Sequence, residues 1–283
     1  MPRDRIAEAQ TQFAARLYVT PTSGTTALIL NTRAAPFTDV RVRRAINYAV
    51  DRAQVAALLG QNSKPACQIL PIGVPGYRRY CPYTIVPNPA GIWRAPDLAR
   101  AQRLIDGSGT RGTPITIWNL DDEALAPADR YLVSLLDRLG YATRVKDFSA
   151  ADPTGDPRFA DSRTAPQAAL YFIPIGLPYP SASQVLQVSF ACQAFVPNSI
   201  ANSNWPEFCD HRLDGQINHA LAAESTNAPD TAALWAQADR TATDQAPAVP
   251  LTTSSDIHLV AARVRNYQYS LAQGVLLDQL WVR

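Results

Sequence analysis

The chain has 283 residues, of which 47% are hydrophobic and 18% are charged, and its formal net charge is +2. This length is enough for one large domain or two small ones with a full hydrophobic core. The sequence has no basic or acidic run and no apolar stretch near eighteen residues, which argues against nucleic acid or a membrane surface as partner and against a transmembrane helix.

The first thirty residues combine a polar opening with two apolar stretches. The opening, MPRDRIAEAQTQF, lacks the basic, apolar and small-residue regions of a signal peptide. Residues 17–19 and 27–30 are apolar enough to be strands, and Pro21, Ser23 and Gly24 predict a turn between them. Pro36 restricts the residue before it to extended conformations, which is consistent with a strand over residues 28–32.

Residues 37–60 carry the clearest helical pattern. Asp39 can cap the first helix and Asp51 a second, short helix that ends at Gly60. In the first, apolar residues recur at spacings of three and four and make one face: Val42, Ala45, Ile46, Ala49, Val50 and Ala53. Residues 61–95 are rich in proline and show no sustained periodicity, so we predict an extended loop there.

The four cysteines lie in two local pairs, Cys67 with Cys81 and Cys192 with Cys209. An even number in short loops favours two disulfides in an oxidising compartment. A metal site is a second reading, since His211 and His219 follow Cys209 closely, but no Cys-x-x-Cys or His-x-x-x-His spacing completes a tetrahedral set. Four free thiols are the third.

From residue 95 onward helices and strands alternate. We predict helices at about 96–107, 126–139, 210–221 and 231–246, and strands at 114–119, 141–145 and 168–173. Asp210 can cap the third of these helices, with His211 and His219 on its solvated face. Strands separated by single helices indicate βαβ units and a parallel sheet.

Ligands of open α/β sheets bind beyond the carboxyl ends of the strands, which selects a set of candidate residues. Each of these has a structural alternative, because the aromatic residues can belong to the core and the asparagines can serve turns. The candidates at the strand ends and in the later loop are Trp118, Asn119, Tyr171, Ile175, Gly176, Tyr179, Asn202 and Asn204.

The run LNTRAAPFTDVRVRRAINYAVDR closely resembles the signature of the family 5 extracellular solute-binding proteins, the peptide, dipeptide and nickel binders that serve ABC importers. The matching positions are Asn31, Thr32, Pro36, Phe37, Asp39, Arg41, Val42, Arg43, Ala45, Ala49, Asp51 and Arg52. The end of the chain is also similar to the family, through Pro247, Pro250, Leu251, Arg263, Val264, Leu277, Asp278, Leu280 and Trp281.

This resemblance implies a fold and a division of the chain. The fold is an α/β lobe like that of class II periplasmic binding proteins, with a mixed, mainly parallel sheet and strands that return to an incomplete first lobe. Residues 1–30 are expected in lobe I and the hinge, 31–246 in the ligand-binding lobe II, and 247–283 in a return to lobe I. Family members are usually longer and carry a secretion or lipoprotein signal, so the chain resembles their C-terminal part.

One segment departs from the family pattern. Peptide binders of this family typically have Trp-x-Ala-Asp-Tyr, with the aspartate pairing with the amino terminus of the peptide. Aligning the tyrosine with Tyr179 puts Ile175 at the tryptophan and Pro178 at the aspartate. A buried ammonium needs an anionic partner, so we expect a less charged ligand or one anchored elsewhere.

The resemblance therefore implies the substrate-binding component of an ABC transporter, which binds a small solute or peptide in an interlobe cleft and works with an ABC permease. We expect an extracytoplasmic monomer without enzymatic activity, cofactor or nucleic-acid partner. One alternative is a regulatory or sensor domain of the same fold. Another is a small-molecule hydrolase using His258 with Ser254 or Ser255. The acidic trio at 121–123 is either a solvated loop or a metal or acid–base site.

Overall fold

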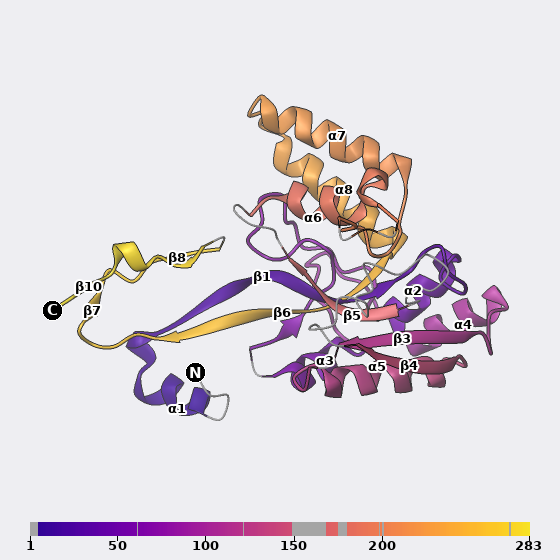
Figure 1. Cartoon of the computed structure of the whole chain (residues 1–283), viewed down its shortest axis with the longest axis horizontal. Coiled ribbons are helices and arrows are strands. Elements are labelled where there is room, and N and C mark those ends of the chain that lie inside the picture. The colour runs from indigo at the N-terminus through magenta and orange to yellow at the C-terminus, as the bar shows by residue number, and fades with distance from the viewer. Residues whose placement is uncertain are drawn as a thin grey trace.

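The computed structural model of the chain describes residues 5–60, 62–120, 122–148, 168–174, 180–197, 199, 201–271 and 273–283. A sheet and two layers of helices make up its larger part, and a long arm projects from one side (Figure 1). No helix in this described part of the chain has both the length and the apolar content needed to cross a membrane.

The central sheet has six strands in the order β2-β6-β1-β5-β3-β4. Their bounds are β1 Leu17–Leu30, β2 Lys64–Pro65, β3 Pro114–Leu120, β4 Ala142–Phe148, β5 Ala168–Pro174 and β6 Ala248–Leu259. The strand β3 runs parallel to both β4 and β5, whereas the pairs β1–β5, β1–β6 and β2–β6 are antiparallel. The α/β class and the mixed sheet are confirmed, but the expectation of a mainly parallel sheet is wrong, because the strands that bring the chain in and out lie side by side at its centre.

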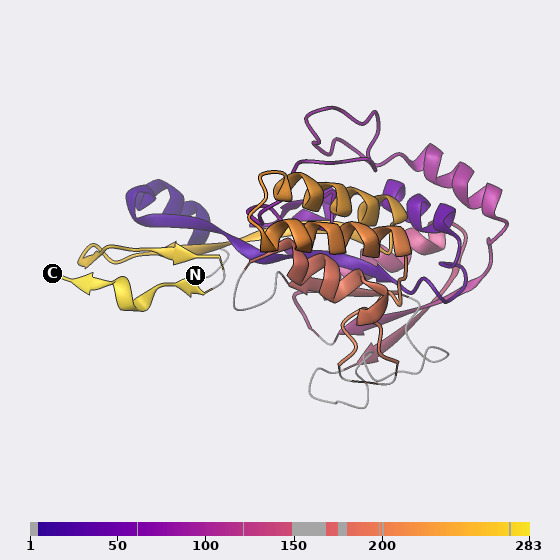
Figure 2. The same cartoon turned by 90° about the horizontal axis from the view of Figure 1, so that it is seen from above.

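Helices cover both faces of the sheet. The helices α2 (Val40–Ala49), α3 (Arg52–Leu59), α4 (Leu98–Ser108) and α5 (Ala126–Arg138) share one core, and α6 (Ala182–Phe190), α7 (His211–Ser225) and α8 (Thr231–Gln245) share the other. Successive strand residues point to opposite faces, so Leu28 and Leu30 of β1 enter the first core and Ala27 and Ile29 the second. Figure 2 shows α7 and α8 side by side over the sheet.

Four of the helices begin at an aspartate whose carboxylate accepts a backbone N–H of the first turn. These are Asp39, Asp51 and Asp97, which cap α2, α3 and α4, and Asp210, which caps α7. The caps at Asp39, Asp51 and Asp210 are where the sequence predicts them, and α4 begins two residues after its predicted start at residue 96. Helix α6, capped by Ser181, was not predicted from the sequence.

Arg52, one of the residues of the family-like run 30–52, has a structural role in the core. The Arg52 side chain is 0% exposed, and its Nε donates to the carbonyl oxygens of Ala66 and Pro250, both at 2.8 Å. Its Nη1 donates to the Asn47 carbonyl oxygen at 2.8 Å. Burial lowers the pKa of Arg52 to about 10, which leaves the guanidinium charged at neutral pH. Arg52, in α3, thus joins α2, the residue after β2 and β6 through backbone and side-chain carbonyl groups.

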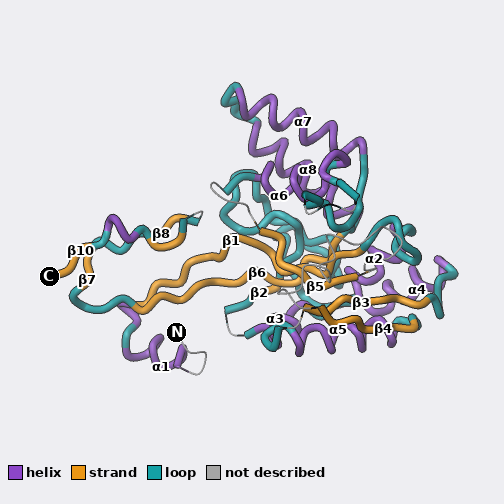
Figure 3. The backbone as a smooth tube through the Cα atoms, in the orientation of Figure 1, coloured by secondary structure: helices purple, strands orange, loops and turns teal. Residues whose placement is uncertain are grey.

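The arm consists of the first part of β1 and the last part of β6, which pair from Leu17 with Leu259 to Pro21 with Ser255. In Figure 3 these strands run out together from the sheet. The predicted turn at residues 21–24 is wrong, because β1 continues through it and absorbs the irregularity as register shifts between residues 21 and 25 and between residues 26 and 27. The elements at the arm's end are α1 (Ile6–Gln12), β7 (Val264–Arg265), β8 (Tyr269–Ser270), β9 (Gly274–Val275) and β10 (Trp281–Val282).

Candidate functional site

A cavity of about 250 Å³ lies between the arm and the carboxyl edge of the sheet. We call it the arm pocket. Its lining comes from α1, the middle of β1, the end of α3 and the loop after it, the loop after β3, and β6. The lining residues are Ile6, Thr26, Leu59, Gly60, Asn62, Ser63, Ala124, Leu125, Ser254, Ser255 and Asp256.

The arm pocket is chemically mixed. Ile6, Leu59 and Leu125 supply apolar surface, and the hydroxyl and amide side chains supply neutral donors and acceptors. Among the described residues that line it, Asp256 is the one charged residue, and none is a lysine or an arginine. A pocket with this lining suits a neutral or ammonium-bearing molecule better than an anion.

Trp118 and Asn119 lie at the end of β3, as predicted, but do not line the arm pocket. The indole of Trp118 is 4% exposed, and Nζ of Lys146 lies 3.9 Å from the centre of its ring. The Oδ1 atom of Asn119 is buried and accepts no hydrogen bond from the described residues. Ligand contact by either residue stays a prediction.

The remaining candidates near β5 are only partly within reach of the structure. The backbone of Tyr171 lies in β5 opposite Ala27 of β1. Ile175, Gly176, Pro178 and Tyr179 lie outside the described residues. Their contact with a ligand also stays a prediction.

Asn202 and Asn204 organise the loop before α7. The Asn204 side chain is fully buried, and its Nδ2 donates to the carbonyl oxygens of Ala191 at 2.9 Å and Phe208 at 2.7 Å. Its Oδ1 accepts from the Phe208 backbone N–H at 2.9 Å, and Oδ1 of Asn202 accepts from the Val196 backbone N–H at 3.3 Å. These bonds are the turn chemistry that the sequence left open as an alternative to ligand contact.

The cysteines form the two expected disulfides, Cys67 with Cys81 and Cys192 with Cys209. His211 and His219 are exposed on α7, as predicted. A second cavity, of about 400 Å³, lies beside the first disulfide at the β2 edge of the sheet, away from the carboxyl ends of β3 and β5. It was not predicted, because the loop that lines it shows no periodic pattern.

The hydrolase alternative does not fit the strand that carries its residues. Ser254, Ser255 and His258 all lie in β6. Because an extended strand rises about 3.3 Å per residue, His258 is about 10 Å from Ser255, too far for a base to accept a proton from its hydroxyl. The His258 ring instead packs near Tyr267 and Tyr269, with ring centres 6.0 Å apart in both cases.

A cavity beside the carboxyl ends of the strands of an α/β sheet is a usual place for a small-molecule ligand, and here the sheet carries helices on both faces. Residues 1–195 match the family model for the bacterial extracellular solute-binding proteins, family 5 (middle), and the chain belongs to this family. This is a family of solute-binding proteins and not of enzymes, so the expectation of a non-enzymatic protein is confirmed.

Individual relatives agree with the family. Over 72 residues the chain is 35% identical to the periplasmic oligopeptide-binding protein OppA of Haemophilus influenzae, a match that covers 25% of this chain and 13% of that protein.

Solved structures share the fold over the whole chain. Clavulanic acid biosynthesis oligopeptide binding protein 2 superposes with a TM-score of 0.81 at 19% identity, covering 99% of this chain and 50% of that one. The unliganded open form of the periplasmic murein tripeptide binding protein MppA superposes with a TM-score of 0.78 at 19% identity, covering 100% of this chain and 52% of that one. DppA from Helicobacter pylori, in complex with the peptide STSA, superposes with a TM-score of 0.74 at 18% identity, covering 99% of this chain and 51% of that one. The chain therefore spans about half the length of these structures.

Proposed function

We propose that this chain supplies the ligand-binding lobe and the hinge of the substrate-binding component of an ABC importer, and that the solute binds in the arm pocket. In this proposal residues 31–246 are lobe II, while residues 1–30 and 247–283 are the hinge and part of lobe I. The observation that carries it is the position of the arm pocket, which is lined both by α1 on the arm and by the loops at the carboxyl edge of the sheet.

The strands β1 and β6 have the form of a hinge. They are the two connections between the sheet and the arm, and their register shifts lie where the arm leaves the sheet. A shift in register interrupts the ladder of hydrogen bonds, so bending there disturbs fewer bonds than bending elsewhere. Such a bend would bring Ile6 closer to Leu125 and close the arm pocket over a solute.

The apolar surface of the arm supports its assignment to lobe I. Leu277 is 74% exposed, Val282 62%, Val19 56% and Trp281 49%. All four lie on β1 or the C-terminal elements of the arm, and exposed apolar groups gathered in one region mark a contact with other protein. We take that contact to be the rest of lobe I.

A peptide is the ligand class with the most support. The solved relatives include the complex of DppA with the peptide STSA and that of Haemophilus influenzae OppA with RPPGFSPFR. Pro178 cannot pair with an amino terminus, but Asp256 can, since it supplies a carboxylate among the described residues that line the arm pocket. We therefore place the amino group of the ligand beside Asp256. The disulfides and the periplasmic relatives support an extracytoplasmic location.

The test is titration calorimetry of the chain with trialanine and with N-acetyl-trialanine. We expect trialanine to bind and acetylation to weaken its binding by at least about tenfold, because acetylation removes the positive charge. Asp256→Asn should abolish this preference, while Asp278→Asn, a carboxylate change on the arm but outside the pocket, should preserve it. Failure of free peptides to bind, or an unchanged preference in Asp256→Asn, would refute the proposed mode of binding.

A further inference from the structure

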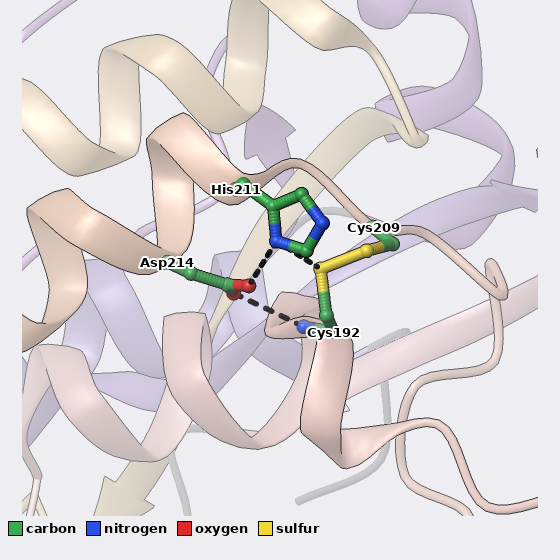
Figure 4. Close-up of side chains that lie close together, drawn as sticks. All are labelled: Cys192, Cys209, His211 and Asp214. Atoms are coloured by element: carbon green, nitrogen blue, oxygen red, sulfur yellow. Dashed lines mark hydrogen bonds and ion pairs between the residues drawn. A yellow bond between two sulfur atoms is a disulfide. The ribbon is translucent and has the colours of Figure 1, made fainter.

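Four potential metal ligands lie together at the second disulfide, its own two cysteines and the side chains of His211 and Asp214 (Figure 4). One ligand atom from each of Cys192, Cys209, His211 and Asp214 lies within 4.8 Å of all the others. Nδ1 of His211 is 3.5 Å from Oδ2 of Asp214 and 3.9 Å from Sγ of Cys192. His219, the histidine that spacing alone offered, is not part of this cluster.

Local structure holds these groups together without help from a metal. Asp210 caps α7, so His211 and Asp214 occupy positions i and i+3 on one side of its first turn. The other carboxylate oxygen of Asp214 accepts the backbone N–H of Cys192 at 3.1 Å, which ties the 3-10 turn η4 (Cys192–Ala194) to α7. The His211 side chain is 90% exposed, so an ion can reach it from solvent.

We propose that reduction of this disulfide creates a binding site for one Zn²⁺, with Cys192, Cys209, His211 and Asp214 as its ligands. Two thiolates, an imidazole and a carboxylate form the four-coordinate set that zinc accepts. Zinc–ligand bonds of about 2.0–2.3 Å at tetrahedral angles put ligand atoms about 3.3–3.8 Å apart. The His211–Asp214 and His211–Cys192 distances already lie close to this range. The two bonded sulfurs must separate, and any pair that is up to 4.8 Å apart must close slightly.

The disulfide controls the site through the chemistry of sulfur. In the disulfide neither sulfur is a thiolate, and the thiolate is the form that binds zinc. A phosphine reductant transfers two electrons to the S–S bond, which takes up two protons to give two thiols, while the phosphine and a water oxygen become a phosphine oxide. Zn²⁺ binding then releases both thiol protons to solvent. The ion would join η4 to α7 in place of the lost covalent bond.

The first disulfide provides a matched comparison within the same chain. Cys67 and Cys81 belong to no group of three or more potential metal ligands in the part of the chain that the structure describes. Reduction should therefore create one zinc site and not two. A double variant, Cys67→Ser with Cys81→Ser, leaves the proposed site as the sole source of thiolates.

The experiment follows Co²⁺, a spectroscopic substitute for zinc, in the full chain with and without a phosphine reductant. We expect thiolate-to-cobalt absorption with one equivalent bound in the reduced parent and in the Cys67/Cys81 double variant, and none in the oxidised parent. His211→Gln should weaken binding by at least about tenfold, while His219→Gln should not change it. Circular dichroism of the reduced proteins serves as the control for folding.

A second readout covers loss of structure on reduction. Zn²⁺ should raise the melting temperature of the reduced Cys67/Cys81 double variant but not of the same variant with Cys192→Ser and Cys209→Ser. The proposal is overturned if the absorption persists without Cys192 and Cys209, if His211→Gln and His219→Gln behave alike, or if Zn²⁺ leaves the melting temperature unchanged.

Discussion

The carboxyl group of Asp129 should make the protein less stable as the pH rises, and its replacement by asparagine should remove this effect. Asp129 lies in the first turn of α5 with 2% of its surface exposed, and its Oδ1 accepts no hydrogen bond from the described residues. Burial and, after it, the negative charge of Asp147 raise the pKa of Asp129 to about 7, against the opposing charge of Arg130.

The sign and size of the effect follow from this pKa. The pKa in the folded protein is above the ordinary value of 3.8, so the folded state holds the proton more tightly than the unfolded state. The contribution of Asp129 to stability is therefore fully present below pH 3.8 and is lost as the pH rises through about 7. A shift of about three units corresponds to about 4 kcal/mol, and the α5 N-terminus, which favours the anion, reduces this to about 3 kcal/mol.

The assay is urea unfolding of the parent and of Asp129→Asn between pH 4 and pH 8.5. The stability of the variant relative to the parent should increase by about 3 kcal/mol from pH 4 to pH 7 and then level off. Any free-energy cost of burying the amide does not depend on pH. Such a cost shifts the stability difference between variant and parent equally at every pH and leaves its dependence on pH unchanged. Asp230→Asn, an exposed change of the same kind at the start of α8 where the side chain caps nothing, is the matched control. A pH-independent difference between Asp129→Asn and the parent would refute the reasoning.

Three further changes have defined outcomes in the same unfolding assay. Arg52→Met should lower the free energy of unfolding by about 3–5 kcal/mol, because buried carbonyl groups lose their donors. Arg41→Met, at an exposed site, should lower it by less than about 1 kcal/mol, and equal losses in the two variants would contradict this role of Arg52. Asp239→Asn should cost about 1–3 kcal/mol at pH 7.5, because this buried carboxylate accepts from two donors of the loop 61–95, and a gain in stability would contradict that. Replacing Cys67 and Cys81 by serine should cost about 2–4 kcal/mol, since the disulfide closes a loop with a sequence separation of 14; no loss would show that the bridge adds nothing.

Local chemistry explains the parts of the fold that the sequence predicts well. An aspartate cap depends on two or three neighbouring residues, so Asp39, Asp51 and Asp210 mark helix starts correctly. Strand pairing depends on segments far apart in the chain, and the antiparallel pairing of β1 with β5 and β6 has no local signal. The proline and glycine at 21–24 predict a turn because nothing nearby shows that β6 pairs with this segment.

The same distinction applies to the arm pocket. The carboxyl edge of the sheet was predicted, and Leu125, just after β3, does line the pocket. The other walls come from α1, α3 and β6, which the fold brings together from distant parts of the chain. A usable signal was present in Ser254, Ser255 and Asp256, which end a run of five polar residues within a strand that begins with buried apolar ones.

The chain enters and leaves its helix-covered part at adjacent points. The backbone N–H of Leu30, at the end of β1, donates to the carbonyl oxygen of Pro247 at 3.1 Å, just before β6 begins. The segment between Leu30 and Pro247 therefore begins and ends at neighbouring points of the sheet, as an inserted domain does. Fluorophores placed on α1 and on the loop after β3 would report its rotation as a single body, and the insert could be transplanted into another host sheet without stretching either end.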